Sequence, residues 1–590
     1  MSVGGLLVPG PERVRAGGEV DVAAAAGKLV AELRAQPWGR VSASVYETGR
    51  LVSLAPWLPG HADRVAFLTA TQRADGGWGA PDGYDLVPTL SATEALVAEL
   101  GREDHAGYRA ILVQTAGRGL AMLRRRSGEN GGHARDLPDM PAIELIVPAL
   151  LSGIGERLAA AERGGPARLA AGGPPGLPAG MDGTKLAAVR ALLASGAAAP
   201  LKLLHALEIA GAAAGTAAVE PVPVVLPGAE GTAGTAGASG VAAVGGSPAA
   251  SAAWLAGAGN GSVTGTGGGE ADSGGSVRRY LEEVVARHGG PVPCALPITV
   301  FERGWTLSWL RRAGVPVEVP RDLVASLDAA AVPGGCPAGP GLPPDADTTS
   351  VALYAAALLG EPREPAGLWA YETGTHFCTW QGEEGASPTV NAHVLDAFGE
   401  YLRRVSGVSG VSGVSGVPAR YGAAVRRLSG WLCDRQEPDG SWRDRWHASP
   451  YYATACCALA LEDFGGPESA GAVRRSADWV LATQREDGSW GRWEGTAEET
   501  AYALQTLLLT DAAGPAGEEA RARAVERGYR SLLGSVDDRG VPVEIPALWH
   551  DKDLYAPVAI ITAVVLGALH LARRALSRPA VPANPPVPRG

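Results

Sequence analysis

Two aspartates with the spacing D-x-D, Asp345 and Asp347, stand at the start of the apolar segment ADTTSVALYAAALLG. A run of this length and composition predicts a helix, so both carboxylates lie in or just before its first turn. Two like charges held this close do not ionise together easily, and the pKa of one of them rises. A carboxyl group that stays protonated can donate its proton, which predicts an acid catalyst. The competing interpretation is a helix cap, because Asp, Thr and Ser all cap helices well.

The elements that must position this pair are helices. Alanine- and leucine-rich segments with helical spacing recur along the chain, and alternating strand patterns are nearly absent, so we expect an all-α fold. A turn of the form Q-x-x-D-G-[GS]-W occurs three times, starting at Gln72, Gln436 and Gln484. We expect each turn to be followed by a threonine that opens a helix, at Thr93, Thr454 and Thr500. A repeat of roughly forty residues with helix pairs favours a toroid or a solenoid.

A toroid would bring distant helix starts together. In an α/α barrel the inner helices run parallel, so their N-termini share one rim. Asp347 and Asn391, each near the start of such a helix, would then be neighbours. The same rim gathers the positive ends of helix dipoles, which favours an anionic ligand.

Composition limits the function classes. The chain has 590 residues and a formal net charge of −11, which argues against general affinity for nucleic acid or anionic membranes. None of the six cysteines forms a CxxC pair, which is typical of reduced thiols in the cytoplasm. The N-terminus lacks the pattern of a signal peptide. The apolar run 556–571 is shorter than the ~20 residues of a membrane span, so we expect a buried helix and no membrane insertion.

Two segments have low complexity. Residues 231–269 carry no charge and consist mostly of Gly, Ala, Ser and Thr, and residues 405–416 are four copies of V-S-G. Neither composition buries enough apolar surface to offset the entropy of ordering. We therefore expect surface loops, the first within a disordered stretch at about 212–275.

Several motifs together resemble the class II terpene cyclases, most closely the bacterial ones that make bicyclic prenyl diphosphates. The motifs are PWGRVSASVYETGR, LPDMPAIELIVPAL, VFERGW, D-A-D-T, SPTVNAHVLDAF, GSWRDRWHASPYYAT, GTAEETAYALQTL and LWHDKDLYAP. The acid motif of the family is D-x-D-D, and here Thr348 replaces the last acid. The D-x-D-T-T variant is similar to bacterial drimenyl diphosphate synthases, which act on the C15 substrate farnesyl diphosphate.

The resemblance implies two α/α barrels with the active site between them. The barrel that carries the acid motif would comprise residues 20–60 and 286–580, with a second barrel, 61–285, inserted. Relatives that ionise the diphosphate carry DDxxD, and the only adjacent aspartates of that kind here, in VDDRG, do not match. The product would therefore keep its diphosphate.

The resemblance also implies roles for the residues of the acid motif. Asp347 would be the proton donor, and Asp345 would raise its pKa. Thr348 would change how the proton is held, and Asn391 would hydrogen-bond the acid. His393, two residues further on, would point elsewhere and pack as a core histidine.

Aromatic rings can stabilise carbocations through cation–π contacts. The candidates are Trp305, Trp380, Trp442, Tyr452, Tyr502 and Trp549, and for each of them core packing is an open alternative. Trp78 and Trp490 belong to the repeated turns and are expected to be structural. Arg445 and Lys552 are the candidates for binding the diphosphate, although either could form a surface ion pair. Mg²⁺ would be held mainly by diphosphate oxygens, with Glu144 as the candidate protein ligand.

The sequence thus predicts a cytoplasmic, protonation-initiated cyclase that converts farnesyl diphosphate to drimenyl diphosphate. The first alternative is the same chemistry on geranylgeranyl diphosphate, which gives a copalyl-type diphosphate. A squalene-hopene type cyclase and a non-catalytic α-toroid that binds prenyl lipids are further alternatives. We expect a prenyl diphosphate as the partner, with a homodimer left open.

Overall fold

The computed structural model describes residues 20–102, 108–127, 136–164, 169, 172–215, 217–225, 240–258, 273–383, 385–406, 417–511 and 515–577. Helices dominate these residues. Paired strands are confined, in the described part of the chain, to two antiparallel pairs of two residues each: β1 (Val222–Pro223) with β2 (Ala242–Ala243), and β3 (Trp549–His550) with β4 (Leu554–Tyr555). The predicted all-α class is confirmed.

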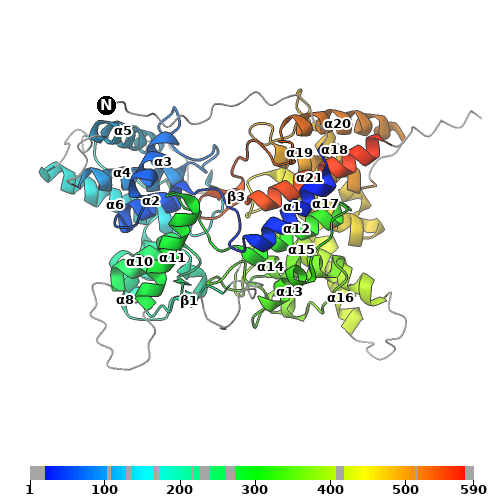
Figure 1. The fold of residues 1–590 in the computed structure, drawn as a ribbon, viewed down its shortest axis with the longest axis horizontal. Coiled ribbons are helices and arrows are strands. Elements are labelled where there is room, and N and C mark those ends of the chain that lie inside the picture. Colours follow the sequence, from blue (N-terminus) through cyan, green and yellow to red (C-terminus); the bar gives the residue numbers. More distant parts are fainter. Residues whose placement is uncertain are drawn as a thin grey trace, which may run out of the picture.

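Six helices form a closed ring in which each helix contacts the next. In ring order they are α12 (Thr299–Arg312), α14 (Ala346–Leu358), α15 (Pro388–Ser406), α17 (Pro450–Phe464), α19 (Ala497–Leu509) and α21 (Val558–Leu576). A second layer packs outside this ring: α1 (Val22–Ala35), α13 (Arg321–Ala329), α16 (Val417–Asp434), α18 (Ala470–Ala482) and α20 (Pro515–Gly534). Inner and outer helices alternate along the chain except between α14 and α15, where the short η3 (Ala366–Tyr371) takes the place of an outer helix. Residues near the N-termini of α14, α15, α17 and α19 contact one another in turn, so these inner helices point the same way. This α/α barrel fills one half of the molecule, on the right in Figure 1.

The barrel closes through the two ends of the chain. α1 contacts both α21 and α12, so it covers the joint between the last and the first inner helix. α21 is long and apolar enough to cross a membrane by length and composition alone. Most of it is buried as an inner helix of the ring, as expected for residues 556–571.

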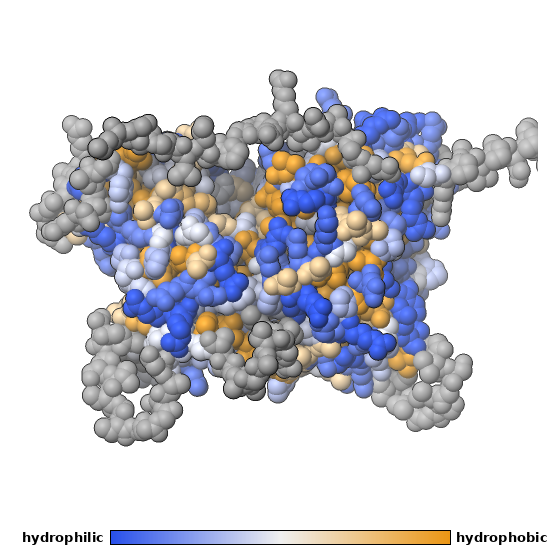
Figure 2. Space-filling view, in the orientation of Figure 1, coloured by the Kyte–Doolittle hydropathy of each residue, from blue (hydrophilic) through white to orange (hydrophobic). Residues whose placement is uncertain are grey.

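The other half of the molecule has a hydrophobic core of its own (Figure 1). Its elements are α2 (Val45–Leu54), α3 (His61–Ala70), α4 (Leu86–Leu100), α5 (Arg109–Arg126), α6 (Ile143–Gly164), α8 (Thr184–Ala194), α9 (Leu201–Leu204), η2 (Leu207–Gly215), α10 (Pro248–Ala258) and α11 (Ser273–His288). α4 is its central helix, with all of its residues buried. Hydrophilic residues cover much of the outside of both halves in the same view (Figure 2).

Helix α2 differs from the predicted division of the chain. The sequence placed residues up to 60 with the acid-bearing barrel, but α2 packs against α4 and α10 of the other half. Its buried side chains explain this, because Tyr46 and Val52 belong to the second core while Leu51 faces the first. α2 therefore joins the two halves.

The prediction of a disordered stretch at 212–275 is partly wrong. Residues 240–258 form β2 and α10, and the alanines of α10 are buried against η2. Small side chains allow this, since a Cβ on Gly215 would come within 2.3 Å of the backbone of Gly257. Residues 231–239, 259–269 and 407–416 lie outside the described residues, and 405–406 end α15.

The three repeated turns share one set of hydrogen bonds. The indole Nε1 of Trp78, Trp442 and Trp490 donates to a carbonyl ten residues earlier, at Leu68, Leu432 and Val480. The backbone N–H of each tryptophan donates to a threonine Oγ1, at Thr89, Thr454 and Thr500. The expectation that Thr93, Thr454 and Thr500 open their helices is wrong, because they lie inside α4, α17 and α19. In the first turn Thr89, and not Thr93, accepts the hydrogen bond from the tryptophan. The backbone and indole N–H groups of Trp442 are both bound inside its turn, which favours core packing over a contact with substrate.

Candidate active site

Asp345 is the N-cap of α14. Its Oδ1 accepts a hydrogen bond of 2.6 Å from the backbone N–H of Thr348, and the Thr349 hydroxyl donates to its carbonyl. Burial and then the nearby charge of Asp347 raise the pKa of Asp345 to about 7, although the hydrogen bonds from Thr348 and Asp347 lower it. Asp345 is therefore both a cap and a carboxyl group that holds a proton close to neutral pH.

Asp347 contacts a histidine. Its Oδ1 lies 2.6 Å from Nδ1 of His393, which projects from the next inner helix, α15, and both side chains are largely buried. Burial lowers the pKa of His393, but the charge of Asp347 and the hydrogen bond between them hold it well above the ordinary value. His393 therefore donates to Oδ1 and leaves Oδ2 as the oxygen that can carry a proton.

The predicted roles of Asn391 and His393 are reversed. The Asn391 amide donates to the carbonyls of Phe377 and Ser387, and its Oδ1 accepts from the N–H of Phe377. Both amide protons are used there, so the predicted hydrogen bond to the acid is absent. Residues two apart in a helix point about 200° apart, so only one of these two side chains can face Asp347. That side chain belongs to His393.

An aromatic cluster continues from His393 along the barrel rim. The His393 ring meets Trp305 edge-on at 5.4 Å and lies 6.5 Å from Tyr452, and Trp305 Nε1 donates to the Tyr452 hydroxyl. Tyr452 also packs on His447 at 4.5 Å and on two further rings, those of Tyr502 and Trp549. The structure therefore gathers four of the predicted aromatic residues, Trp305, Tyr452, Tyr502 and Trp549, around one point.

Trp380 lies apart from this cluster. It is half-buried and meets Trp446 edge-on at 5.2 Å, and the guanidinium of Arg445 lies over the Trp446 ring. Trp380 is thus associated with the cationic side of the site.

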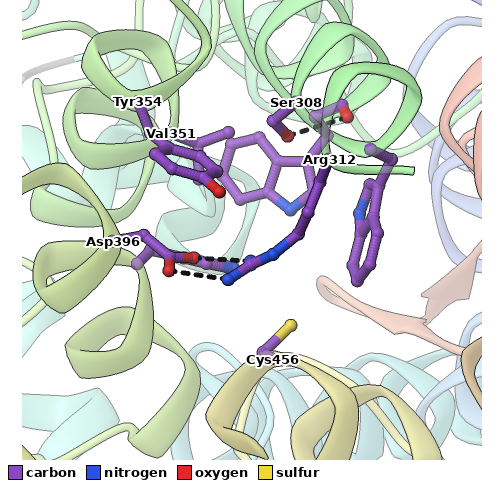
Figure 3. Close-up of a pocket in the computed structure, with 9 residues that line it drawn as sticks. Ser308, Arg312, Val351, Tyr354, Asp396 and Cys456 are labelled. Atoms are coloured by element: carbon purple, nitrogen blue, oxygen red, sulfur yellow. Dashed lines mark hydrogen bonds and ion pairs between the residues drawn. The ribbon is translucent and has the colours of Figure 1, made fainter. Parts of the chain in front are cut away.

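A small cavity of about 20 Å³, enough for one water molecule, lies inside the barrel beside His393. Figure 3 shows its ion pair, in which Arg312 binds Asp396 through two bonds of 2.9 and 3.0 Å. Arg312 also reaches Asp463, which is one-third exposed. Cys456 and Tyr354 also line this cavity, so the interior of the barrel holds a buried ion pair beside His393.

A larger cavity of about 380 Å³ lies between the two halves. Three arginines, Arg443, Arg445 and Arg492, line it together with His447 and His550. Carboxylates from the second half face them: Asp139 binds Arg445, and Asp82 binds Arg492 and Trp493. His447 lies both on this cavity and against Tyr452, so it connects the arginines to the aromatic cluster.

Lys552 does not lie in this cavity. Its side chain is fully buried and forms ion pairs with Glu47 and Glu208. The ammonium group also donates to Ser247 Oγ and to the His205 carbonyl, both at 2.8 Å. The prediction that Lys552 binds the diphosphate is wrong, because these partners from the second half already use its protons.

The surroundings of Glu144 are not those of a metal ligand. Its side chain is more than half exposed and forms an ion pair with Lys185. Among the described residues there is no group of three or more His, Cys, Asp or Glu side chains that could hold a metal ion. The residues present therefore do not form a protein cage for Mg²⁺.

Sequence reasoning missed four residues of this site: His393, Arg443, His447 and Arg492. The helical angle between His393 and Asn391 shows that only one of them can face Asp347, but it does not show which one. Arg443 lies two residues before Arg445 in the same loop, RDRWH, and was visible as a second charge. His447 follows in the same loop, and nothing in the sequence alone marked it as a residue of the site.

Comparisons with known proteins give a consistent result. The family model of the squalene-hopene cyclase C-terminal domain matches residues 413–541. An ent-copalyl diphosphate synthase of Streptomyces sp. (strain KO-3988) is 41% identical over 552 residues, which cover 93% of this chain and 96% of that protein. A labda-7,13-dienyl diphosphate synthase of Streptomyces clavuligerus is 40% identical over 605 residues, 100% of this chain and 98% of that protein. The solved structure of an ent-copalyl diphosphate synthase from Streptomyces platensis matches with a TM-score of 0.78 and 42% identity, over 94% of this chain and 99% of that chain.

Proposed function

This chain belongs to the bacterial class II terpene cyclases, and we propose that it cyclises geranylgeranyl diphosphate to a bicyclic, copalyl-type diphosphate. The observation that carries the proposal is the buried Asp345–Asp347 pair, held by His393 at the edge of an aromatic cluster. Protonation of an alkene by a carboxylic acid needs a donor of this kind in a dry, cation-stabilising site.

The expectation of a C15 substrate is wrong. It rested on Thr348 alone, whereas relatives similar over almost the whole chain are copalyl and labdadienyl diphosphate synthases. Thr348 is buried, and its backbone N–H is a donor to the Asp345 cap. A residue in that position affects how the acid pair is held and does not measure the length of the substrate chain.

The chemistry begins at Oδ2 of Asp347. Its proton adds to the terminal alkene and leaves a tertiary carbocation, and the C–C double bonds further along the chain close two rings in turn. Asp347 becomes a carboxylate, and the hydrogen bond from His393 Nδ1 to Oδ1 stabilises the charge that develops. The neighbouring Asp345, with its raised pKa, stays largely protonated below about pH 7 and so adds little like charge.

The aromatic cluster stabilises the cations. Trp305, Tyr452 and Trp549 present π faces or edges within one connected group next to the acid. Cation–π contacts contribute about 1–2 kcal/mol each where water is excluded. None of these rings carries a full negative charge that would quench the cation early.

The diphosphate would bind in the cavity between the two halves. Arg443, Arg445 and Arg492 provide the positive charge there, and His447 leads from that cavity to the aromatic cluster. This arrangement separates the anionic end of the substrate from the acid at the other end. It also explains why the diphosphate is retained, because Asp347 acts on the far end of the chain.

Magnesium remains a proposal. Mg²⁺ would arrive on the diphosphate oxygens, and four aspartates line the same cavity: Asp82, Asp136, Asp139 and Asp444. Mg²⁺ would neutralise part of the diphosphate charge. The proton transfer described above does not pass through it.

The experiment is a side-by-side assay of the C20 and C15 substrates. Purified protein is incubated with geranylgeranyl or farnesyl diphosphate, and the dephosphorylated products are identified by mass spectrometry. We expect a bicyclic C20 alcohol at a higher kcat/KM than any C15 product. A bicyclic product from farnesyl diphosphate only would refute the proposed substrate, and binding without any product would refute the proposed reaction.

A further inference from the structure

The acid explains how the reaction starts, but a proton must also leave the last carbocation. The acceptor of that proton must be a basic group that is held in the dry site and is not already neutralised. Three of the rim residues described above, His447, Tyr502 and Trp549, contact a second buried carboxylate, Glu498, whose side chain is 2% exposed.

Glu498 occupies the position of Asp347 on a different helix. Asp347 is the second residue of α14, and Glu498 is the second residue of α19. In the closed ring α12–α14–α15–α17–α19–α21, three steps separate α14 from α19 in either direction. Since the inner helices run parallel, the two carboxylates lie at the same level on opposite sides of the rim.

The two oxygens of Glu498 have different surroundings. Oε1 accepts from Trp549 Nε1 at 2.8 Å and from the Tyr502 hydroxyl at 3.3 Å. His447 Nδ1 accepts from the Ser449 N–H, so its Nε2 carries the proton and donates to the same Oε1 at 3.3 Å. Oε2 is buried and has no hydrogen-bond partner among the described residues.

A buried carboxylate oxygen without a hydrogen-bond partner destabilises the fold, because it has lost its hydration without a replacement. The neighbouring Glu499 shows that the fold can avoid this cost. Its Oε1 accepts from Ser449 Oγ and from the Arg492 N–H, and its Oε2 accepts from Thr496 Oγ1. The fold therefore satisfies every oxygen of Glu499 and leaves one oxygen of Glu498 open.

Asp347 and Glu498 lie beside the same group of aromatic side chains. Tyr452 contacts His393, the partner of Asp347, and also His447, the partner of Glu498. Burial, and the charges of Asp347 and Glu498 among others, raise the pKa of Tyr555, which precedes α21. One aromatic wall thus separates the proton donor from the second carboxylate.

We propose that Glu498 is the proton acceptor that ends the cyclisation, and this inference rests on the proposed function. Oε2 takes a proton from a carbon next to the final cation. The electrons of the broken C–H bond form the new double bond and neutralise the cation, and Glu498 becomes a neutral carboxylic acid. Glu498 then loses that proton to water, and Asp347 regains one, so the reaction is an isomerisation without net proton uptake.

The test compares Glu498→Gln with Glu499→Gln in the full-length chain on geranylgeranyl diphosphate. Glutamine keeps the size of the side chain and the Oε1 acceptor but is not a base. We expect Glu498→Gln to lower kcat by about 10²-fold or more and to yield hydroxylated or isomeric bicyclic products in place of a single alkene. Glu499→Gln, at a capping residue, should form the wild-type product.

Further outcomes separate this inference from the proposed function. If wild type forms no bicyclic product, the proposed function fails; if wild type is active and Glu498→Gln gives the same alkene at a similar rate, only the acceptor role of Glu498 fails. Equal losses in both variants would assign Glu498 a structural role and overturn the inference. If Glu498→Gln does not fold, Glu498→Asp is the second variant, because it keeps the carboxylate but shortens the side chain by one methylene. An unchanged rate and product in Glu498→Asp would also overturn the inference.

Discussion

At the scale of single residues, the acid is defined by what surrounds it. Asp345 caps α14, and its pKa is raised. The Asp347 side chain is not the cap and contacts His393 instead. The division of labour explains why two acids occur where a cap needs one. It also makes the two aspartates distinguishable by experiment.

Replacing Asp345 by Asn should stabilise the protein more at pH 8 than at pH 5. The pKa of Asp345 is about 7 in the fold, above its ordinary value of 3.8, so its stabilising protonated form is lost as pH rises through about 7. Three pKa units correspond to up to about 4 kcal/mol in the free energy of unfolding. Denaturant titrations at the two pH values measure this. The matched control is Asp21→Asn, at the exposed cap of α1, and its effect on the free energy of unfolding should be the same at both pH values. If both variants had equal effects, the raised pKa of Asp345 would be contradicted.

His393 and Asn391 should fail in different ways. His393→Phe removes the donor to Asp347 Oδ1, so we expect kcat to fall by about 10²-fold with little change in KM. Asn391→Leu leaves the Phe377 backbone groups without partners, which costs about 1–3 kcal/mol of stability. Steady-state kinetics and thermal denaturation separate the two. A large loss of kcat in a stable Asn391→Leu protein, with His393→Phe active, would restore the role first expected for Asn391.

At the scale of elements, the sequence predicted the helices and the repeated turns well. The rim that joins Asp347 to the next inner helix followed from the repeat alone. The sequence did not predict which side chain of α15 contacts Asp347, because the face that α15 turns toward α14 depends on how the neighbouring helices pack. The aromatic residues illustrate the same limit, because nothing in the sequence distinguishes Trp442 from Trp549. In the structure, Trp442 is held in its turn by hydrogen bonds to Leu432 and Thr454. Trp549 instead donates a hydrogen bond to Glu498.

The repeated turns should contribute stability and not product identity. Trp490→Phe removes the Nε1 hydrogen bond to Val480 and leaves a cavity, so we expect a loss of about 2–4 kcal/mol. The product from geranylgeranyl diphosphate should stay the same. Trp57→Phe, at a tryptophan that is 43% exposed, is the control and should have little effect on the melting temperature. A changed product mixture for Trp490→Phe would show that this turn shapes the active site.

At the scale of the whole molecule, ion pairs connect the two halves. Some of these pairs are buried, and others line the cavity between the halves. Lys552 from the loop before α21 reaches Glu47 on α2 and Glu208 on η2, and Asp551 of the same loop binds His205. These partners are hundreds of residues apart, so sequence reasoning assigned Lys552 to the diphosphate by default. The same distance hid the boundary at α2. Local periodicity did predict the all-α class, and the family resemblance implied the two barrels.

Lys552→Met should destabilise the contact between the barrels. It leaves Glu47 and Glu208 buried without their cation, at a cost of about 3–5 kcal/mol. The pKa of Glu47 is already raised to about 7, by burial above all, and without Lys552 it would rise further. The protonated form is then favoured in the fold, so the destabilisation should be smaller at pH 6 than at pH 8. Lys185→Met, which breaks the exposed pair with Glu144, is the control and should change stability little at either pH.

The central claim is that Asp347 donates the proton that starts cyclisation of geranylgeranyl diphosphate. The most direct measurement is the rate at which Asp347→Asn forms the bicyclic diphosphate, compared with wild type under the same conditions. Asparagine keeps the shape and an acceptor for His393 but has no acidic proton, so the account predicts a loss of at least about 10²-fold with the fold intact. Formation of the same bicyclic product by Asp347→Asn at a rate close to that of wild type would contradict the account.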